Sequence, residues 1–257
     1  MTGLERIVHM LQHKEADRVA AGPLVCGASR RVYGCTYAEW AQDGELAGKS
    51  MVQATELIQP DGVLSLVDLS VEAADFGQEV IFPCEDTPHP NYDNPFIKTP
   101  DDYLKIQPLD PTKAPRMKEM IKYCDIMATE LGKTKAIMGF VYAPLGILSM
   151  MGGAERVFRD CMKNKEYVIK GMEIINEVLI DYIKALCKVG VHAIVLDTLF
   201  ASQCIMSKKL WRETEFPFAK KLADTVRECG ALPIVHNCGN GVYFDIQIEA
   251  LAPAAIS

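Results

Sequence analysis

Short apolar runs alternate along the chain with longer segments in which apolar residues recur at helical spacing. The runs are almost continuously apolar, which is typical of strands in a parallel sheet that is packed on both faces. The predicted strands are Val19–Val25, Val63–Asp68, Lys135–Val141, Ala193–Asp197 and Leu232–His236, with a sixth beginning near Ala254. The pattern therefore predicts a sheet of about six strands.

Helical segments lie between these strands. The most regular is Glu166–Val189, in which apolar residues repeat every three or four positions from Ile169 to Leu186. The other predicted helices are Tyr37–Leu57, one within Asp101–Leu131, Glu155–Cys161 and Ser207–Cys229, with Ser207 as an N-cap. Regular alternation of strands and helices predicts parallel pairing through right-handed crossovers, which doubly wound sheets and closed barrels both satisfy.

The number of strands and the end of the sequence bear on the choice between these folds. A closed α/β barrel has eight strands, and the last residues, Ala-Ile-Ser, lie in an apolar run. An open sheet of about six strands would expose two apolar edges, which favours aggregation. We therefore expect residues 1–257 to form a single α/β domain, a (β/α)8 TIM barrel that is incomplete at its C-terminus and truncated after about six strands.

Composition narrows the class of protein. The 257 residues carry 34 acidic and 27 basic side chains, a formal net charge of -7. No cluster of Lys and Arg is present to bind phosphates, so nucleic acid is not expected as a partner. No uninterrupted apolar stretch of about 18 residues occurs, so no membrane span is predicted. The nine scattered cysteines and the amphipathic N-terminal segment predict a cytoplasmic protein with reduced thiols.

The segment around His236 and Cys238 carries the strongest chemical signal. An apolar strand leads directly into these residues, and side chains two positions apart in an extended segment face the same side. Their imidazole and thiol can therefore converge at the carboxyl end of the strand, where barrels build their active sites. One nitrogen and one sulfur ligand suit zinc. The alternatives are a buried cysteine beside a hydrogen-bonded histidine, and a catalytic histidine.

Carboxylates end two other predicted strands. Asp68 ends the second strand and Asp197 the fourth, so both are expected at the same end of the sheet as His236. Each is a candidate general base, an orienting partner for the histidine or a helix N-cap. Further zinc ligands could come from Cys204, Asp197, Glu213 and Glu215, among which the spacing does not select. Other candidates for this rim are Glu72, Arg30 and Arg31, for which solvated positions are the alternative.

Five segments, in order along essentially the whole chain, carry a family resemblance. They are Glu5 through Val19, Asp68 through Gly77, Tyr142 through Gly153, Asp197 through Ser202, and His236 through Gly239. These segments resemble the opening helix, the second-strand aspartate, the proline-containing segment, the Asp…Ala-Ser element and the His-x-Cys-Gly element of the uroporphyrinogen-decarboxylase superfamily. The resemblance implies a TIM barrel.

That superfamily contains decarboxylases and also corrinoid-dependent methyltransferases, such as methylcobamide:coenzyme M methyltransferases. The arginine-rich signature expected after the first strand of a decarboxylase is replaced here by Gly27–Tyr33, and Met150 stands where a tyrosine is expected. These departures, together with His236 and Cys238, favour the methyltransferase branch. The resemblance implies that the zinc ligands are these two residues and a later cysteine, which would lie beyond Ser257.

The resemblance also implies a mechanism. Zinc on His236 and Cys238 would deprotonate a small-molecule thiol, coenzyme M being one candidate, and the thiolate would attack a methylcobamide carried by a partner corrinoid protein. Asp68 and Asp197 would orient ligands or accept the released proton. Two other functions stay open: cofactor-independent decarboxylation of a tetrapyrrole, which needs arginines converging on Asp68, and non-catalytic binding of a corrinoid protein. The sequence also leaves the oligomeric state open, a homo-oligomer included.

Overall fold

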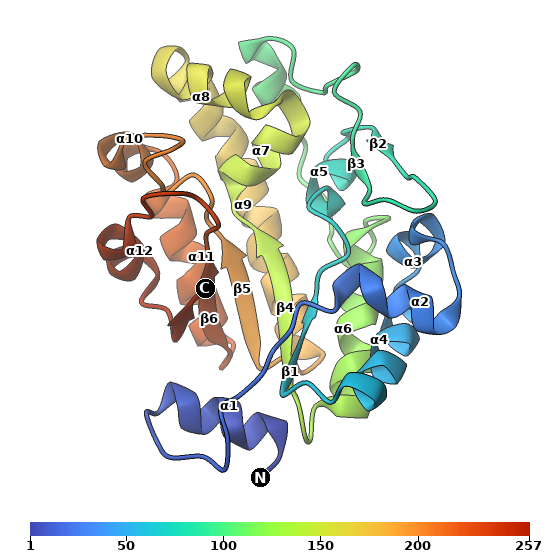
Figure 1. Cartoon of the computed structure of the whole chain (residues 1–257). Helices are drawn as coiled ribbons and strands as arrows, with labels where there is room; N and C mark the ends of the chain where they lie inside the picture. The colour runs from blue at the N-terminus through green and yellow to red at the C-terminus, as the bar shows by residue number, and fades with distance from the viewer.

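A parallel sheet of five strands forms the centre of the protein (Figure 1). The computed structural model describes residues 1–257. The sheet runs in the order β1 (Gly62–Ser65), β4 (Ala136–Tyr142), β5 (Ala193–Asp197), β6 (Leu232–His236) and β7 (Ala255–Ile256). Each successive strand of this sheet lies beside the previous one, whereas a doubly wound sheet reverses its order at a switch point. The sheet therefore has the strand order of an α/β barrel, in agreement with the predicted fold class.

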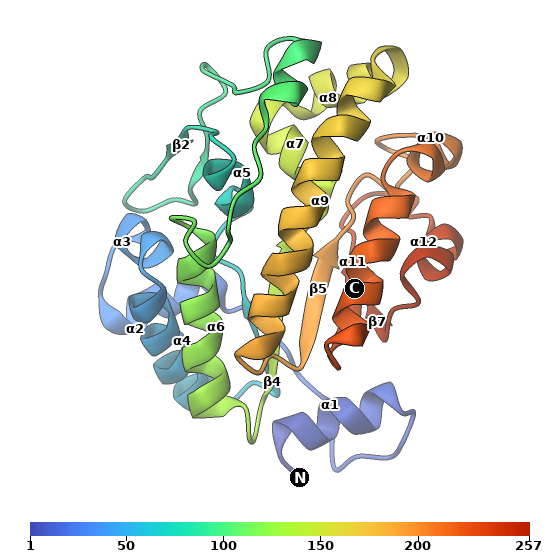
Figure 2. The ribbon, with the colours of Figure 1, turned by 180° about the vertical axis from the view of Figure 1, so that it is seen from behind.

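Helices cover the outer face of this sheet, as Figure 2 shows from behind. The covering helices are α4 (Gly44–Ile58), α6 (Met117–Leu131), α9 (Lys165–Lys188) and α11 (Phe216–Glu228). Strand residues on this face such as Ile137, Ile194 and Val235 are completely buried. The hydrophobic core therefore lies between the sheet and these helices, which is the packing that a barrel wall requires.

Shorter elements surround this two-layer core. They are α1 (Gly3–Leu11), η1 (Cys26–Ser29), α2 (Arg30–Tyr33), α3 (Tyr37–Gln42), α5 (Val71–Asp75), η2 (Pro100–Lys105), α7 (Pro144–Gly152), α8 (Ala154–Lys163), α10 (Lys208–Glu213) and α12 (Phe244–Leu251). The segment 76–94 contains a small antiparallel pair, β2 (Val80–Ile81) and β3 (His89–Pro90). None of the helices combines the length and the apolar composition that a membrane span requires.

The inner face of the sheet is only partly covered. Met138 and Ile234, which alternate along their strands with completely buried residues, are partly exposed on this face. Phe140 and Val195, which are register partners on the same face, are buried. The extended segment 19–25 passes in front of this face near β1 (Figure 1). The sheet therefore has a packed outer face and an apolar inner face that is open to a cavity.

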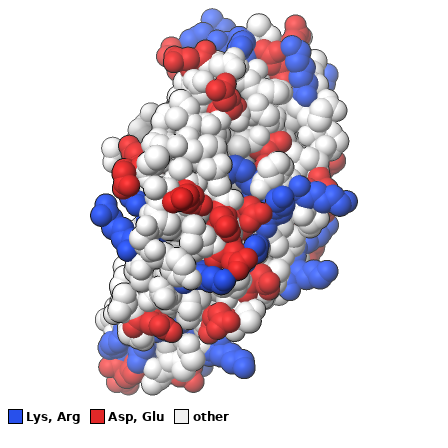
Figure 3. Space-filling view, turned by 90° about the vertical axis from the view of Figure 1, so that its right-hand side faces the viewer, with Lys and Arg blue, Asp and Glu red and all other residues white.

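The side of the molecule that carries α2, α3, α4 and α6 has charges of both signs (Figure 3). Glu45 of α4, for example, pairs with Lys49 on the same helix and with Lys122 of α6. Exposed pairs of this kind contribute little to stability individually. This face therefore shows interspersed charges and no extended patch of one sign.

Most predicted strands agree closely with the structure. Ala193–Asp197 and Leu232–His236 coincide with β5 and β6, and Lys135–Val141 matches β4 to within one residue at each end. The prediction Val63–Asp68 is too long, because β1 ends at Ser65. The apolar pattern therefore located these strands well, because each has one completely packed face.

Two predicted helices are each divided in two. Tyr37–Leu57 contains both α3 and α4, because Asp43 is extended and its carboxylate caps a new helix by accepting two backbone N–H groups of α4. Ser207–Cys229 contains α10 and α11, separated where the backbone of Thr214 leaves the helical region. Ser207 does cap α10, as predicted, by accepting the N–H of its third residue at 3.2 Å.

The first predicted strand, Val19–Val25, is wrong. This segment is extended but forms no strand, and Val19 and Leu24 are 86% and 70% exposed. Its backbone meets the beginning of β1 only where the Ala21 carbonyl accepts the N–H of Asp61. A strand needs a ladder of such bonds, so an apolar run without a paired neighbour does not make one.

Asp61, directly before β1, holds the N-terminal segment in place. Its buried carboxylate accepts hydrogen bonds from Arg18 at 2.6 and 2.9 Å, from Arg6 at 3.0 Å and from the Ala21 N–H at 2.7 Å. Burial by itself would raise the pKa of this carboxyl, but the hydrogen bonds outweigh burial and lower the pKa to about 2. The N-terminal segment that contains Arg6 and Arg18 is therefore anchored by one ionised side chain.

We expect Asp61→Asn to lower the free energy of unfolding by about 2–3 kcal/mol, because a neutral amide cannot pair with both arginines. Urea unfolding at neutral pH measures this loss. The matched control is Asp17→Asn, which removes an exposed partner of Arg6 and should cost much less stability than Asp61→Asn. Equal losses in the two variants would contradict the anchoring role of Asp61.

Candidate active site at the carboxyl ends of the strands

The carboxyl ends of β4, β5 and β6 bring three polar side chains into one row. Tyr142 is the register partner of Asp197, and Asp197 is the register partner of His236. Register partners in neighbouring parallel strands point to the same face, and His236 lines the inner face. Asp197 and His236 therefore lie side by side, as the sequence predicted, and Tyr142 joins them. We call this carboxyl edge of the inner face the mouth.

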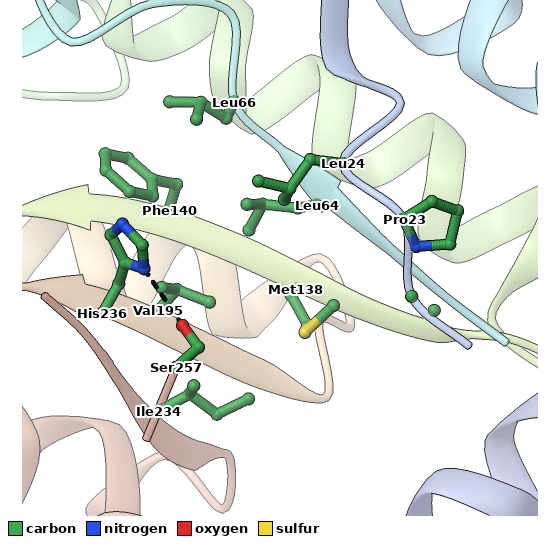
Figure 4. A pocket seen from close by; sticks show the side chains of 12 residues that line it. Pro23, Leu24, Leu64, Leu66, Met138, Phe140, Val195, Ile234, His236 and Ser257 are labelled. Carbon is green, nitrogen blue, oxygen red and sulfur yellow. Dashed lines mark hydrogen bonds between the residues drawn. The ribbon is translucent and has the colours of Figure 1, made fainter. Parts of the chain in front are cut away.

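His236 lies beside a cavity on the inner face (Figure 4). The cavity has a volume of about 340 Å³, and apolar side chains such as Leu64, Leu66 and Phe140 form most of its lining. The Nδ1 atom of His236 is 3.0 Å from the Oγ atom of Ser257, and no group of the chain hydrogen-bonds to Nε2. The imidazole is therefore open to the cavity and not enclosed in the core.

Cys238 follows β6, and its thiol is exposed. The intervening Asn237 is buried, where its amide donates to the Thr198 carbonyl at 2.7 Å and accepts the N–H of Gly239 at 2.9 Å. Asn237 therefore fixes the backbone of the loop that carries Cys238 directly after β6.

Gly239 lets two loops of the mouth approach each other closely. A Cβ atom at this position would collide with the Oγ atom of Ser202, in the loop after β5. The Ser202 hydroxyl also lies 3.3 Å from the sulfur of Cys204, and its hydrogen bond lowers the pKa of that exposed thiol. The close approach therefore positions the loops that carry Cys204 and Cys238 next to each other.

Asp197 is buried at the end of β5, and its Oδ1 atom has no hydrogen-bond partner. Burial raises the pKa of this carboxyl to about 7, although the N–H of Leu199 opposes the shift. Leaving a buried acceptor unpaired costs free energy. Asp197 therefore keeps one carboxyl oxygen without a partner inside the protein.

Glu215 supplies a second buried carboxyl, between α10 and α11. Its oxygens accept the indole N–H of Trp211 at 2.8 Å and the backbone N–H of Leu145 at 2.8 Å. Burial raises the pKa of Glu215 to about 7. Both oxygens are thus engaged in joining α7 to the α10–α11 junction. Glu213, by contrast, is exposed and pairs with Lys165 at 2.9 Å.

Asp68 lies three residues beyond β1 and is held by a buried arginine. The Nη2 and Nη1 atoms of Arg116 donate to its carboxylate at 2.7 and 3.3 Å, and the N–H of Ser70 donates at 2.7 Å. The Arg116 guanidinium also stacks over the ring of Phe82, 5.0 Å from its centroid. Sequence reasoning missed Arg116, because it precedes α6 by one residue and follows Asp68 by 48 residues, with no local motif.

Glu72 and Arg30 are buried, so the solvated positions considered for them are wrong. Glu72 accepts the N–H of Tyr142 at 3.2 Å, and burial raises its pKa to about 7. Arg30 donates to Glu85 at 2.7 Å, and only Arg31 of the predicted pair is exposed. Arg30 is therefore already paired with a carboxylate of this chain.

The donor set predicted for zinc is present in part. His236 and Cys238 both lie at the mouth, but no three His, Cys, Asp or Glu side chains come together in an arrangement that could hold a metal ion. A catalytic zinc site takes about three protein ligands and one open position. This chain therefore supplies two candidate ligands, and their role stays a prediction.

A protein-family comparison identifies the class to which this chain belongs. The family model described as uroporphyrinogen decarboxylase (URO-D) matches residues 2–257. The chain therefore belongs to the uroporphyrinogen decarboxylase family, as the five segments predicted. A solved methyltransferase from Methanosarcina mazei shares the fold, with a TM-score of 0.80 and 20% identity, over 99% of this chain and 74% of that chain.

Curated relatives come from both branches of the family. Methylcobamide:CoM methyltransferase MtbA of Methanosarcina mazei is 22% identical over 245 residues, which cover 93% of this chain and 70% of that protein. Uroporphyrinogen decarboxylase of Campylobacter concisus is 25% identical over 203 residues, which cover 76% of this chain and 57% of that protein. The chain thus spans a little over half the length of the decarboxylase that it matches. The methyltransferase matches support the predicted branch.

The buried Glu215 carboxyl should make stability depend on pH. Its pKa is about 7 in the folded protein and about 4.3 in an unfolded chain. At a pH between these two pKa values, the folded protein keeps a proton on Glu215 that the unfolded chain releases. Glu215 should therefore lower the free energy of unfolding by about 1–3 kcal/mol as the pH rises from about 5 to about 8.

Urea unfolding at these two pH values measures the effect. The Glu215→Gln variant should show a smaller fall in stability than the native protein, because the amide does not titrate. Glu213→Gln, at the exposed neighbouring glutamate, is the matched control. Its free energy of unfolding should decrease with pH as much as that of the native protein. An unchanged fall in Glu215→Gln would show that this carboxyl is ionised in the folded protein.

Proposed function

We propose that this protein is a zinc-dependent methyltransferase that moves a methyl group between a corrinoid and a thiol. The observation that carries the proposal is the placement of His236 and Cys238 at the carboxyl end of β6, one beside the cavity and the other exposed. An imidazole nitrogen and a thiolate sulfur form a donor pair that suits zinc. A third protein ligand and the substrate thiol would complete a tetrahedral site.

Zinc at this position would act as a Lewis acid that lowers the pKa of a coordinated thiol. Asp197, the register neighbour of His236, has an unpaired oxygen that can accept the proton the thiol releases. Because burial favours the protonated form of this carboxyl, the proton can be held there near neutral pH. Asp68 takes a different role, since Arg116 holds its carboxylate in a fixed position at the same edge.

The proposed methyl donor is a methylcobamide on a partner corrinoid protein, and the proposed acceptor is a small thiol such as coenzyme M. The similarity to methylcobamide:CoM methyltransferase MtbA supports both. The lining of the cavity beside His236 is mostly apolar and contains no Lys or Arg. Such a lining suits contact with uncharged parts of a donor or acceptor.

Cofactor-independent decarboxylation of a tetrapyrrole is the second candidate. The Campylobacter relative favours it, and so does the arginine that lies against Asp68. A porphyrinogen with many acidic side chains needs cationic partners, but Arg116 is paired with Asp68 and Arg30 with Glu85. The charges at the mouth therefore favour methyl transfer. A metal chelator should abolish methyl transfer and leave such a decarboxylation unaffected.

Removing either proposed ligand tests the proposal directly. His236→Ala and Cys238→Ala should each abolish methyl transfer. Each should also weaken zinc binding by more than about 100-fold, because loss of a residue that only supports a metal ligand already costs about 10–100-fold. Metal analysis and transfer from methylcobalamin to a thiol measure the two effects. Cys229→Ala, at the end of α11, is the control and should retain both. Full zinc content and full transfer in His236→Ala would refute the proposal.

A further inference from the structure

We infer that Cys187 and Cys229 are a redox-active pair, which a small-molecule disulfide such as oxidised glutathione converts into a disulfide bond between α9 and α11. Cys187 is the second-last residue of α9, and Cys229 caps the C-terminal end of α11. Both cysteines carry free thiols. They lie at the amino end of the sheet, opposite the mouth, so the pair does not depend on the proposed function.

The repeated strand–helix arrangement brings the ends of these two helices together. α9 and α11 pack against each other, and both end at the amino end of the sheet (Figure 2). The chain then turns into β5 through Gly190 and into β6 through Gly230, which both have a positive φ. The two connections meet where the N–H of Leu232 donates to the His192 carbonyl at 3.0 Å. The sheet therefore holds the two helix ends side by side.

The two thiols are also in contact. Burial raises the pKa of the Cys187 thiol to about 12, and the charge of the Cys229 thiol and a hydrogen bond with it contribute to this rise. A hydrogen bond requires the two groups to touch. Cys187 is half-buried, whereas Cys229 is exposed. A disulfide in solution can therefore reach the sulfur of Cys229, with the sulfur of Cys187 next to it.

The reaction is a thiol–disulfide exchange in two steps. The Cys229 thiolate attacks one sulfur of the small-molecule disulfide, whose other sulfur leaves as a thiolate. The Cys187 thiolate then attacks the Cys229 sulfur of this mixed disulfide, and the remaining half of the small molecule leaves as a second thiolate. The protein loses two electrons and two protons, which convert the small-molecule disulfide into two thiols.

The disulfide bond joins helix ends whose positions the folded chain already fixes. It closes a loop that contains β5, α10 and α11, so it restricts the unfolded chain more than the folded one. Burial gives the Cys187 thiolate no stabilisation, in contrast to oxidising pairs in which a stabilised thiolate favours the reduced form. The bond therefore persists until a reductant restores the two thiols.

Peptide mass spectrometry of the reduced protein after incubation with oxidised glutathione tests the pair. After alkylation of free thiols and digestion, the native protein should yield peptides cross-linked through Cys187 and Cys229. Cys187→Ala should instead retain glutathione on Cys229, because no second thiol releases it. Cys84→Ala, which removes an exposed cysteine of another loop, is the matched control and should cross-link normally. A native protein in which Cys229 stays free or keeps glutathione would overturn the inference.

Urea unfolding gives a second readout. The cross-linked native protein should unfold at a urea midpoint about 1 M higher than the reduced protein, because the bond restricts the unfolded chain. Cys229→Ala should have the same midpoint with and without oxidised glutathione. A cross-linked protein that unfolds at the same or a lower midpoint would show that the bond distorts the helix ends, and would refute the contact between the two thiols. Zinc binding and methyl transfer are measured separately, so either failure leaves the proposed function standing.

Discussion

The register of the parallel strands β4, β5 and β6 is the constraint on which the candidate site depends. Backbone hydrogen bonds hold Tyr142, Asp197 and His236 at matching positions, so their side chains point to the same face. A shift of one residue in β6 would turn His236 toward the helix-covered face and remove it from the mouth. The completely buried outer-face residues oppose such a shift, because it would expose them. The core of the protein thus secures the geometry of the site.

Burial and hydrogen bonding together determine what each carboxyl at the mouth can do. Asp68 is buried against Arg116 and is held as an ion pair. Asp197 and Glu215 are buried without a cation, and burial raises the pKa of each to about 7. They differ in that both oxygens of Glu215 accept N–H groups, whereas Asp197 keeps one oxygen unpaired. The proposed proton transfer therefore assigns Asp197, and not Asp68 or Glu215, as the acceptor.

The loops after β5 and β6 carry the thiols of the mouth, and the rigid sheet positions them. Asn237 and Gly239 fix the loop with Cys238, the first through two buried hydrogen bonds and the second by allowing Ser202 to approach. Function on loops that a packed scaffold holds in place is the usual arrangement in α/β barrels. The proposed chemistry therefore combines an imidazole at the end of a strand with a sulfur on the adjacent loop.

The sequence alone determined β4, β5 and β6 and placed Asp197 and His236 at one end of the sheet, because an almost continuously apolar run is a local feature of each strand. Tertiary structure decided what depends on distant neighbours. Val19–Val25 is as apolar as the true strands but has no ladder beside it, so it forms none. The pairing of Asp68 with Arg116 joins residues that no local pattern connects. Burial and long-range hydrogen bonds arise only when the chain folds, and local spacing does not record them.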